Sequence, residues 1–281
     1  MNIELINTGT ELMLGRVLNT HQQWLCRQLA DLGYVVGRQV TVPDAGPAIQ
    51  QAVRDALTRA DLVITTGGLG PTSDDRTRDL VAELLGRRLE LNAAVLEDIR
   101  QYFSRRNRPQ PRSTEVQAMV PEGATVLPNA FGTAPGLVLE VPGGRPAWLF
   151  MLPGPTRELR PMFTGQVVPW LHKLFPLEQP FVCRNLRTIG LGESQVEERI
   201  SSRMDELVRR GLEIGYCAGT GAVDVRLSVR GADAAQLVAA GEQVLRELVG
   251  PFIFGTGDEV LEQIVIRALT ERRQSLAVAE S

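Results

Sequence analysis

The sequence predicts a doubly wound α/β domain with a mostly parallel sheet, followed by a small α+β domain of split-βαβ order. Three observations lead to this prediction. Strand-like and helix-like segments alternate over residues 1–106, as they do in folds with parallel strands. Pro176 and Pro180 then mark a boundary. After it the expected order is β-α-β-β-α-β. We therefore place the domains at 1–175 and 176–256, with 257–281 beginning a third.

Hydrophobic periodicity supports each element of the first domain. Residues 61–66 form a short apolar run, typical of a parallel strand buried on both faces. Trp24, Leu25 and Leu29 recur at helical spacing, after Asn19 or Thr20 as the N-cap. GLVLEV and AWLFML, joined by PGGRP, resemble a hairpin at one side of the sheet. The expected strands are 3–7, 34–42, 61–66, 136–141 and 147–152, and the expected helices are 20–32, 45–59, 76–86, 92–106 and 155–174.

The second domain is predicted from the same kind of pattern. Val196, Ile200 and Met204 share one face of a helix, and Leu237, with the apolar residues that follow it at helical spacing, shares a face of another. We expect strands at 181–189, 212–217, 223–230 and 252–254, and helices at 194–209 and 232–249. Beyond them, residues 258–281 are expected to start a helix and an apolar strand, LAVAES.

Composition excludes several classes of function. The net charge of −3 argues against general nucleic-acid binding, and no segment is long and apolar enough to span a bilayer. The three cysteines form no CxxC pair and no secretory signal begins the sequence, so we expect a cytoplasmic protein. Lys173 is the only lysine, which rules out a Walker P-loop. Catalysis is therefore expected to use carboxylates, backbone dipoles and a bound metal.

Three polar turns follow predicted strands, and ligands bind at the carboxyl ends of strands in open α/β sheets. The turns are NTGTE at 7–11, VPDAG at 42–46 and the stretch TTGGLGPTSDDRT at 65–77. Glycines at 67, 68 and 70 would let backbone N–H groups approach a ligand closely. With the helix expected after them, those amides form an anion-binding nest.

The carboxylates of the same turns repel an anion unless a cation lies between them. Asp44, Asp74 and Asp75 would face the bound phosphate, and Mg²⁺ or another hard divalent ion would relieve the repulsion. Asp74 or Ser73 could instead cap the following helix, and Glu11 could be a first-turn residue. Two further loops, N129-A-F-G-T-A-P-G136 and L152-P-G-P-T-R-E158, are expected at the same rim.

These motifs together resemble the competence-damage-inducible CinA family. The resemblance is carried by TGTELMLGRVLNTH, TTGGLGPTSDDRT, FGTAPG and LPGPTRE, and it continues through GLGES, VDVRL and FGTGDE in the second domain. Two departures are small: Thr156 stands where many relatives have proline, and VPDAG is a loose form of its motif. The resemblance implies a molybdopterin-binding-like fold for the first domain.

The resemblance also implies an activity, which is hydrolysis of ADP-ribose to AMP and ribose 5-phosphate with a divalent metal (Mg²⁺ or Co²⁺) and K⁺ in a homodimer. Asp44 and Asp75 match the two acidic positions of the family's site and would hold the metal, with Asp74 and Glu11 as further catalytic candidates. The expected substrate-binding residues are Thr8, Gly9, Thr66, Gly67, Gly68, Leu69, Gly70, Pro71, Thr72, Thr77, Gly132, Thr133, Ala134, Pro135, Gly136, Pro153 and Gly154.

Two other functions stay open from the sequence. The same type of site can bind a pterin phosphate and adenylylate it in molybdenum cofactor biosynthesis, or it can bind a nucleotide without catalysis. Full-length relatives continue into a nicotinamide-nucleotide amidase domain that opens at a serine matching Ser281. We therefore expect no deamidation of nicotinamide mononucleotide by these residues alone.

Overall fold

The structure is a computed structural model that describes residues 1–143, 146–219 and 221–279. It divides into two compact units, one of residues 1–30 and 34–176, the other of residues 31–33 and 177–281. Each unit has a buried apolar core of its own.

The first unit is built on a mixed sheet of six strands in the order β2-β1-β3-β8-β7-β6. The strands β2, β1, β3 and β8 are parallel, whereas β7 is antiparallel to both of its neighbours. This arrangement confirms the predicted fold class, and the antiparallel pair β7 and β8 is the predicted hairpin, with residues 144–145 outside the described part. The strands are β1 (Ile3–Thr8), β2 (Val36–Val42), β3 (Leu62–Thr66), β6 (Thr125–Leu127), β7 (Gly136–Val141) and β8 (Ala147–Leu152).

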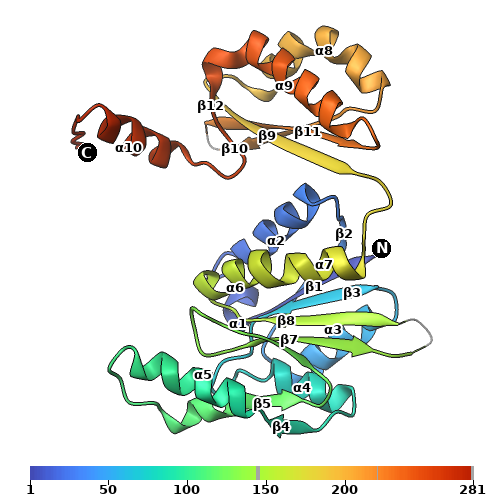
Figure 1. The fold of residues 1–281 in the computed structure, drawn as a ribbon, viewed down its shortest axis with the longest axis vertical. Coiled ribbons are helices and arrows are strands. Elements are labelled where there is room, and N and C mark those ends of the chain that lie inside the picture. The colour runs from blue at the N-terminus through green and yellow to red at the C-terminus, as the bar shows by residue number, and fades with distance from the viewer. Residues whose placement is uncertain (144–145, 220, 280–281) are drawn as a thin grey trace. The chain divides into compact units, whose positions relative to one another are not determined.

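Helices cover both faces of this sheet (Figure 1). On one face lie α2 (Thr20–Asp31), α6 (Thr156–Met162) and α7 (Val168–Leu174), where Trp24 packs edge-on against Phe163 with 5.5 Å between ring centroids. On the other face α3 (Gly46–Leu57), α4 (Thr77–Leu84) and α5 (Ala93–Ser104) bury Ile49, Leu80 and Ile99. Strands covered on both faces are mostly apolar, and β3 is fully buried, with Leu62, Val63 and Ile64 ahead of its two threonines.

Residues 89–91 and 107–135 contain elements that periodicity alone did not indicate. They include a 3₁₀ helix, η1 (Arg112–Ala118), and a two-stranded sheet of β4 (Leu89–Leu91) and β5 (Met119–Pro121). Each is a short element of few residues, for which a repeat of hydrophobic residues cannot be recognised.

The N-cap of α2 is one of the two residues that the sequence indicated. It is Asn19, because its Oδ1 accepts a hydrogen bond from the Gln22 N–H at 3.1 Å.

The second unit is an antiparallel four-stranded sheet in the order β10-β11-β9-β12. Its order along the chain is β9 (Phe181–Ile189), α8 (Glu193–Arg209), β10 (Glu213–Gly219), β11 (Ala222–Arg230), α9 (Ala234–Val249) and β12 (Ile253–Thr256). This is the predicted small α+β fold. Val196, Ile200 and Met204 of α8 and Leu237 of α9 are buried in its core.

One expected element is wrong. A helix, α10 (Leu261–Glu271), does follow β12, but the expected strand LAVAES is not formed in its described part, 276–279. Leu276 and Val278 are exposed there. A strand needs a neighbouring strand for its hydrogen bonds, and no strand of the described residues pairs with this segment. Ser281 lies outside the described residues. Within the described ranges, no helix combines the length and apolar character needed to cross a membrane.

Candidate functional site

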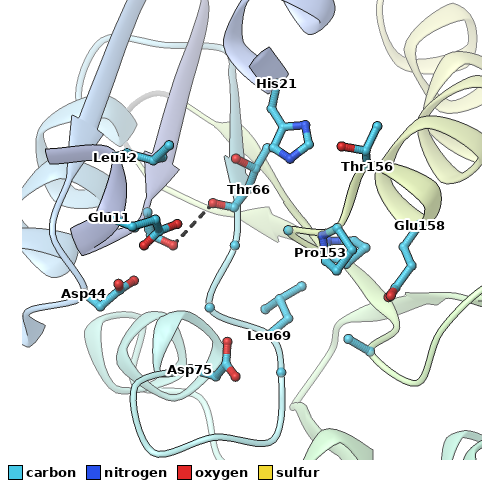
Figure 2. Close-up of a pocket in the computed structure, with 18 of the residues that line it drawn as sticks. Glu11, Leu12, His21, Asp44, Thr66, Leu69, Asp75, Pro153, Thr156 and Glu158 are labelled. Atoms are coloured by element: carbon cyan, nitrogen blue, oxygen red, sulfur yellow. Dashed lines mark hydrogen bonds between the residues drawn. The ribbon is translucent and has the colours of Figure 1, made fainter. Parts of the chain in front are cut away.

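A cavity of about 530 Å³ opens at the carboxyl ends of β1, β3 and β8 in the first unit. Figure 2 shows Glu11 and Asp44 on one side of it, Glu158 on the other, and Leu69 between them. Most of the residues predicted from the sequence line this cavity, and these are Thr8, Gly9, Glu11, Asp44, Thr66, Gly67, Gly68, Leu69, Gly70, Pro71, Asp74, Asp75, Thr133, Ala134, Pro153 and Gly154.

The loop after β3 is held tightly at its first two glycines. Gly67 and Gly68 have φ angles of +94° and +67°, a region in which glycine alone is unstrained. The Gly67 N–H donates to the Leu152 carbonyl at 3.0 Å, and the Gly68 carbonyl accepts from the Thr77 N–H at 3.0 Å. Thr77 is buried below the loop, and its hydroxyl lies 3.4 Å from that of Thr8.

These contacts correct one expectation about the anion nest. The Gly67 amide is used inside the protein and is not available to a phosphate. In the described part of the chain the N–H groups of Gly68 and Gly70 have no hydrogen-bond partner. The amides open to a ligand therefore begin at Gly68, where α4 also points its N-terminus toward the loop.

Asp75 is oriented by Thr72. Its Oδ2 accepts from the Thr72 N–H at 3.1 Å and from the Thr72 hydroxyl at 2.5 Å. Gly70 leaves room for this carboxylate, since a side chain at that position would collide with Asp75. Thr72 itself is exposed and is not among the residues that line the cavity. Its role in the structure is to fix Asp75, which leaves the second carboxylate oxygen for another partner.

Asp74 is exposed and differs from its neighbour. A hydrogen bond from Thr72, and a second one from its own backbone, lower the pKa of the Asp74 carboxyl. The single hydroxyl proton of Thr72 serves only one of the two carboxylates at a time. The expectation that Asp74 or Ser73 caps the helix is wrong, because α4 begins only at Thr77 and its N-cap, Arg76, makes no side-chain cap hydrogen bond.

Asp44 is tied to the turn after β1 by a reciprocal pair of hydrogen bonds. Its Oδ2 accepts from the Thr10 N–H at 2.8 Å, and its own N–H donates to the Thr10 hydroxyl at 3.1 Å. Glu11 follows in the first turn of the short helix α1 (Thr10–Met13) and is exposed. The turns after β1 and β2 therefore present two carboxylates together (Figure 2).

Glu158 is a fifth carboxylate of the wall; it lies in the loop after β8 that was expected at this rim, but it was not among the predicted site residues. It is 6% exposed at the start of α6, and its Oε2 accepts from the Asn129 side chain at 2.8 Å. Asn129 also donates to the Ala134 carbonyl at 2.7 Å. Glu158 thereby anchors the loop that carries Thr133 and Ala134. Its position at the first turn of a helix after β8 was the available signal.

Some of the residues predicted from the sequence do not line the cavity. Gly132 and Pro135 line a small adjoining pocket beside α5. Gly136 is buried as the first residue of β7, where it packs against Met162 and Leu127. In the other direction, the cavity includes residues outside the predicted site residues, and these are Leu12, Val17, Leu18, Asn19, Thr20, His21, Gln117, Pro155, Thr156 and Glu158. The last three belong to the loop 152–158 that was expected at this rim.

His21, at the N-terminus of α2, enters the cavity from above the loop (Figure 2). Its Nδ1 is buried without a hydrogen-bond partner among the described residues. Burial lowers the pKa of the imidazole, a hydrogen bond to the Gly154 backbone partly opposes this, and the charge of Arg160 adds to the lowering. The ring is therefore neutral near pH 7.

The lowered pKa of His21 predicts a loss of stability in acid. Below the ordinary histidine pKa of about 6.5 the unfolded chain binds a proton that the folded imidazole binds only at lower pH. The free energy of unfolding should therefore fall as the pH drops from 7.5 to 5. Chemical denaturation across this range should show a shallower fall for His21→Gln. His172→Gln, at the exposed second histidine, is the control, and equal pH slopes for all three proteins would contradict the prediction.

Asp44 and Asp75 could hold a hard divalent cation if the phosphates of a bound substrate and waters supplied its remaining ligands. Among the described residues, no group of three or more histidine, cysteine or acidic side chains lies together as a metal site. Asp44 and Asp75 each have one oxygen outside the hydrogen bonds given above. Mg²⁺ is usually held by one or two carboxylates, with substrate phosphates and waters completing its shell. The residues present fit such an ion.

Comparisons with known proteins cover both units. The family model described as "Probable molybdopterin binding domain" matches residues 4–173, and that described as "Damage-inducible protein CinA KH domain" matches residues 183–255. The "CinA-like protein" of Akkermansia muciniphila is 42% identical over 281 residues, covering 100% of this chain and 66% of that protein. The "Putative competence-damage inducible protein" of Geobacillus kaustophilus is 41% identical over 284 residues, covering 100% of this chain and 67% of that protein.

A solved structure is similar to the first unit. The protein CinA of Thermoplasma acidophilum, described as of unknown function, is 30% identical with a TM-score of 0.54. The match covers 60% of this chain and 96% of that one. The chain spans about two thirds of the length of the curated relatives it matches.

Proposed function

This chain belongs to the CinA family of competence-damage-inducible proteins, and from that membership we propose that its first domain hydrolyses the pyrophosphate bond of ADP-ribose to AMP and ribose 5-phosphate. One observation carries the proposal. The cavity joins a glycine loop with open amides to two oriented carboxylates, Asp75 of the same loop and Asp44 of the turn after β2. Phosphate chemistry needs both, since amides bind the anion and carboxylates bind the cation that neutralises it.

The chain's own groups divide the work in this proposal. The N–H groups of Gly68 and Gly70 donate to oxygens of the phosphates and stabilise the charge that develops on them. Asp44 and Asp75, each oriented by its threonine, hold a divalent ion, which when bound polarises the phosphoryl group and lowers the pKa of water. Glu11 and Asp74 are exposed carboxylates on the same wall and can accept a proton from the attacking water.

The balance of the reaction is simple. A bond forms between the water oxygen and one phosphorus, and the bond from that phosphorus to the bridging oxygen breaks. The bridging oxygen leaves with the other phosphate. The reaction consumes one water and needs no redox partner; the divalent ion held by Asp44 and Asp75 is the one group it would need beyond the side chains and amides of the cavity wall.

The decisive assay uses the chain as it is. We expect AMP from ADP-ribose in the presence of Mg²⁺ or Co²⁺ with K⁺, measured by liquid chromatography, and none when the divalent ion is removed with EDTA. Absence of AMP with either metal would contradict the proposal. Sedimentation of the same sample tests the homodimer that belongs to the same proposal.

A second candidate is adenylylation of a pterin phosphate. The observation that favours it is the match of residues 4–173, which contain the whole cavity, to a probable molybdopterin binding domain. In that reaction the pterin phosphate would attack ATP and release pyrophosphate. Incubation with ATP and a pterin phosphate should then give pyrophosphate, whereas the hydrolase gives AMP from ADP-ribose without any pterin. Nucleotide binding with neither product would indicate a non-catalytic role.

A further inference from the structure

Gln117 is a buried residue of the cavity lining, and one of the two polar groups of its side chain has no hydrogen-bond partner among the described residues. It lies near the end of η1, is 2% exposed and lines the cavity. Its Nε2 donates to the Leu69 carbonyl at 3.4 Å. Its Oε1 is buried and has no hydrogen-bond partner among the described residues. The free protein therefore holds an unused acceptor inside its own binding site.

The Leu69 carbonyl determines which way the amide faces. A carbonyl oxygen only accepts, so the amide nitrogen must face Leu69 and the amide oxygen must face away from it. Among the described residues, the other buried oxygens without a partner are Asn7 Oδ1 and Thr65 Oγ1, and their residues in β1 and β3 do not line the cavity. Within that part of the chain, Gln117 Oε1 is therefore the unpaired buried oxygen that belongs to a residue of the cavity lining.

An acceptor of this kind selects a ligand with an O–H or N–H group. Leaving a buried acceptor unpaired destabilises the folded protein, and such a cost persists where function needs it. The position of Gln117 indicates which part of a ligand carries that O–H or N–H group. It contacts Leu69, which lies between the two glycines whose amides face the phosphates. The group attached directly to those phosphates in a nucleoside diphosphate sugar is a ribose, which carries hydroxyls, whereas the base lies further away.

We propose that Gln117 is a specificity-determining residue, whose Oε1 accepts a hydrogen bond from a ribose hydroxyl of the nucleoside diphosphate sugar. This assignment rests on the proposed function, because it takes the phosphates to lie on the glycine loop. Gln117 would select among diphosphate ligands, which the glycine loop does not do. Amides and carboxylates hold any diphosphate with its cation, but Gln117 favours diphosphates that carry a sugar hydroxyl at the right place.

The test is an equilibrium titration with the methylene-bridged analogue of ADP-ribose, which cannot be cleaved between its phosphorus atoms. Gln117→Met keeps the length of the side chain and removes both the acceptor and the Nε2 donor to the Leu69 carbonyl. We expect it to raise the Kd of the analogue roughly tenfold, the effect of one lost hydrogen bond. Gln110→Met is the matched control, because Gln110 bonds Thr114 in the same segment and lies outside the cavity. Its Kd should equal that of the wild type.

A comparison of two ligands shows which ribose of ADP-ribose, the terminal one or that of adenosine, donates the hydrogen bond to Gln117. Methylene-bridged ADP lacks the terminal ribose, so equal binding to wild type and Gln117→Met assigns the hydroxyl to that ribose. Tenfold weaker binding to the variant assigns it to the adenosine ribose. A purely structural role predicts a different result, in which Gln117→Met lowers the Tm and leaves both Kd values unchanged. We expect a Tm within about 2 °C of wild type, because the loss of the 3.4 Å hydrogen bond to Leu69 is offset by the removal of a buried unpaired acceptor.

The outcome is separate from that of the hydrolysis assay. If the wild-type protein forms no AMP but Gln117→Met still raises the Kd of the analogue, the proposed hydrolysis is wrong and the proposed role of Gln117 stands. If AMP forms while the variant binds both ligands as wild type does, the role of Gln117 is overturned and hydrolysis stands. An analogue that does not bind the wild-type protein also overturns it.

Discussion

Asp75→Asn is expected to lower kcat for AMP formation from ADP-ribose by roughly a thousandfold while leaving the fold intact. The amide keeps an oxygen that can accept the hydrogen bonds from Thr72. It removes the negative charge that binds a divalent cation next to the phosphates. The measurement is AMP formation at saturating ADP-ribose over a series of Mg²⁺ concentrations.

Two further substitutions make this result specific. Glu97→Gln changes an exposed carboxylate of α5 that lines neither the cavity nor the adjoining pocket, and should leave kcat unchanged. Asp74→Asn should have a smaller effect than Asp75→Asn, because Asp74 is the more exposed of the two and Asp75 has the better-defined orientation. Thermal unfolding should give all three variants a Tm within about 2 °C of wild type. Equal losses for Asp74→Asn and Asp75→Asn would contradict a distinct role for Asp75.

Gly68→Ala is expected to abolish turnover by displacing the glycine loop. Gly68 has a φ of +67°, which disfavours alanine by about 1–2 kcal/mol. The new methyl group would also collide with Thr77, since the ideal Cβ position lies 2.9 Å from Thr77 Cβ and closer still to its hydroxyl oxygen. Thr77 is buried and cannot move aside. The loop must shift, which takes the Gly68 and Gly70 amides out of position. We expect AMP formation to fall more than a hundredfold, roughly the effect of losing oriented amide donors.

Gly86→Ala separates strain from collision. Gly86 follows α4 with a φ of +63°, and a Cβ there would have no atom within 4 Å. It introduces the same backbone strain without the collision and lies away from the glycine loop. Its Tm should fall by a few degrees, as expected for a domain of this size, with full activity. A Gly68→Ala protein that retains activity would show that the loop amides do not bind the phosphates.

The candidate site was largely readable from the sequence because parallel strands end at one edge of a sheet. The turns after β1, β2 and β3 were recognised from glycine and acidic residues after apolar runs, and the structure brings them together at one cavity. Asp44 and Thr10, 34 residues apart in the sequence, are hydrogen bonded there. Their roles in catalysis stay predictions, since proximity does not demonstrate chemistry.

His21, Gln117 and Glu158 could not be found in this way. Gln117 lies in a seven-residue 3₁₀ helix within a segment without periodicity. His21 and Glu158 each begin a helix in which the polar residue looks like an ordinary first-turn side chain. Only the packing of those helices on one face of the sheet, with their N-termini at its carboxyl edge, turns the two side chains into the cavity (Figure 2).

Local sequence patterns alone predicted the two-domain order, the α/β and α+β classes and the turns that carry glycines and aspartates. These features depend on local patterns, namely the spacing of apolar residues and the presence of special turn residues. The tertiary structure alone decided that Leu152 occupies the Gly67 amide, that Thr72 orients Asp75 and that Gln117 keeps a free acceptor. Such hydrogen bonds depend on three-dimensional distances between residues, and periodicity along the chain carries no information about them.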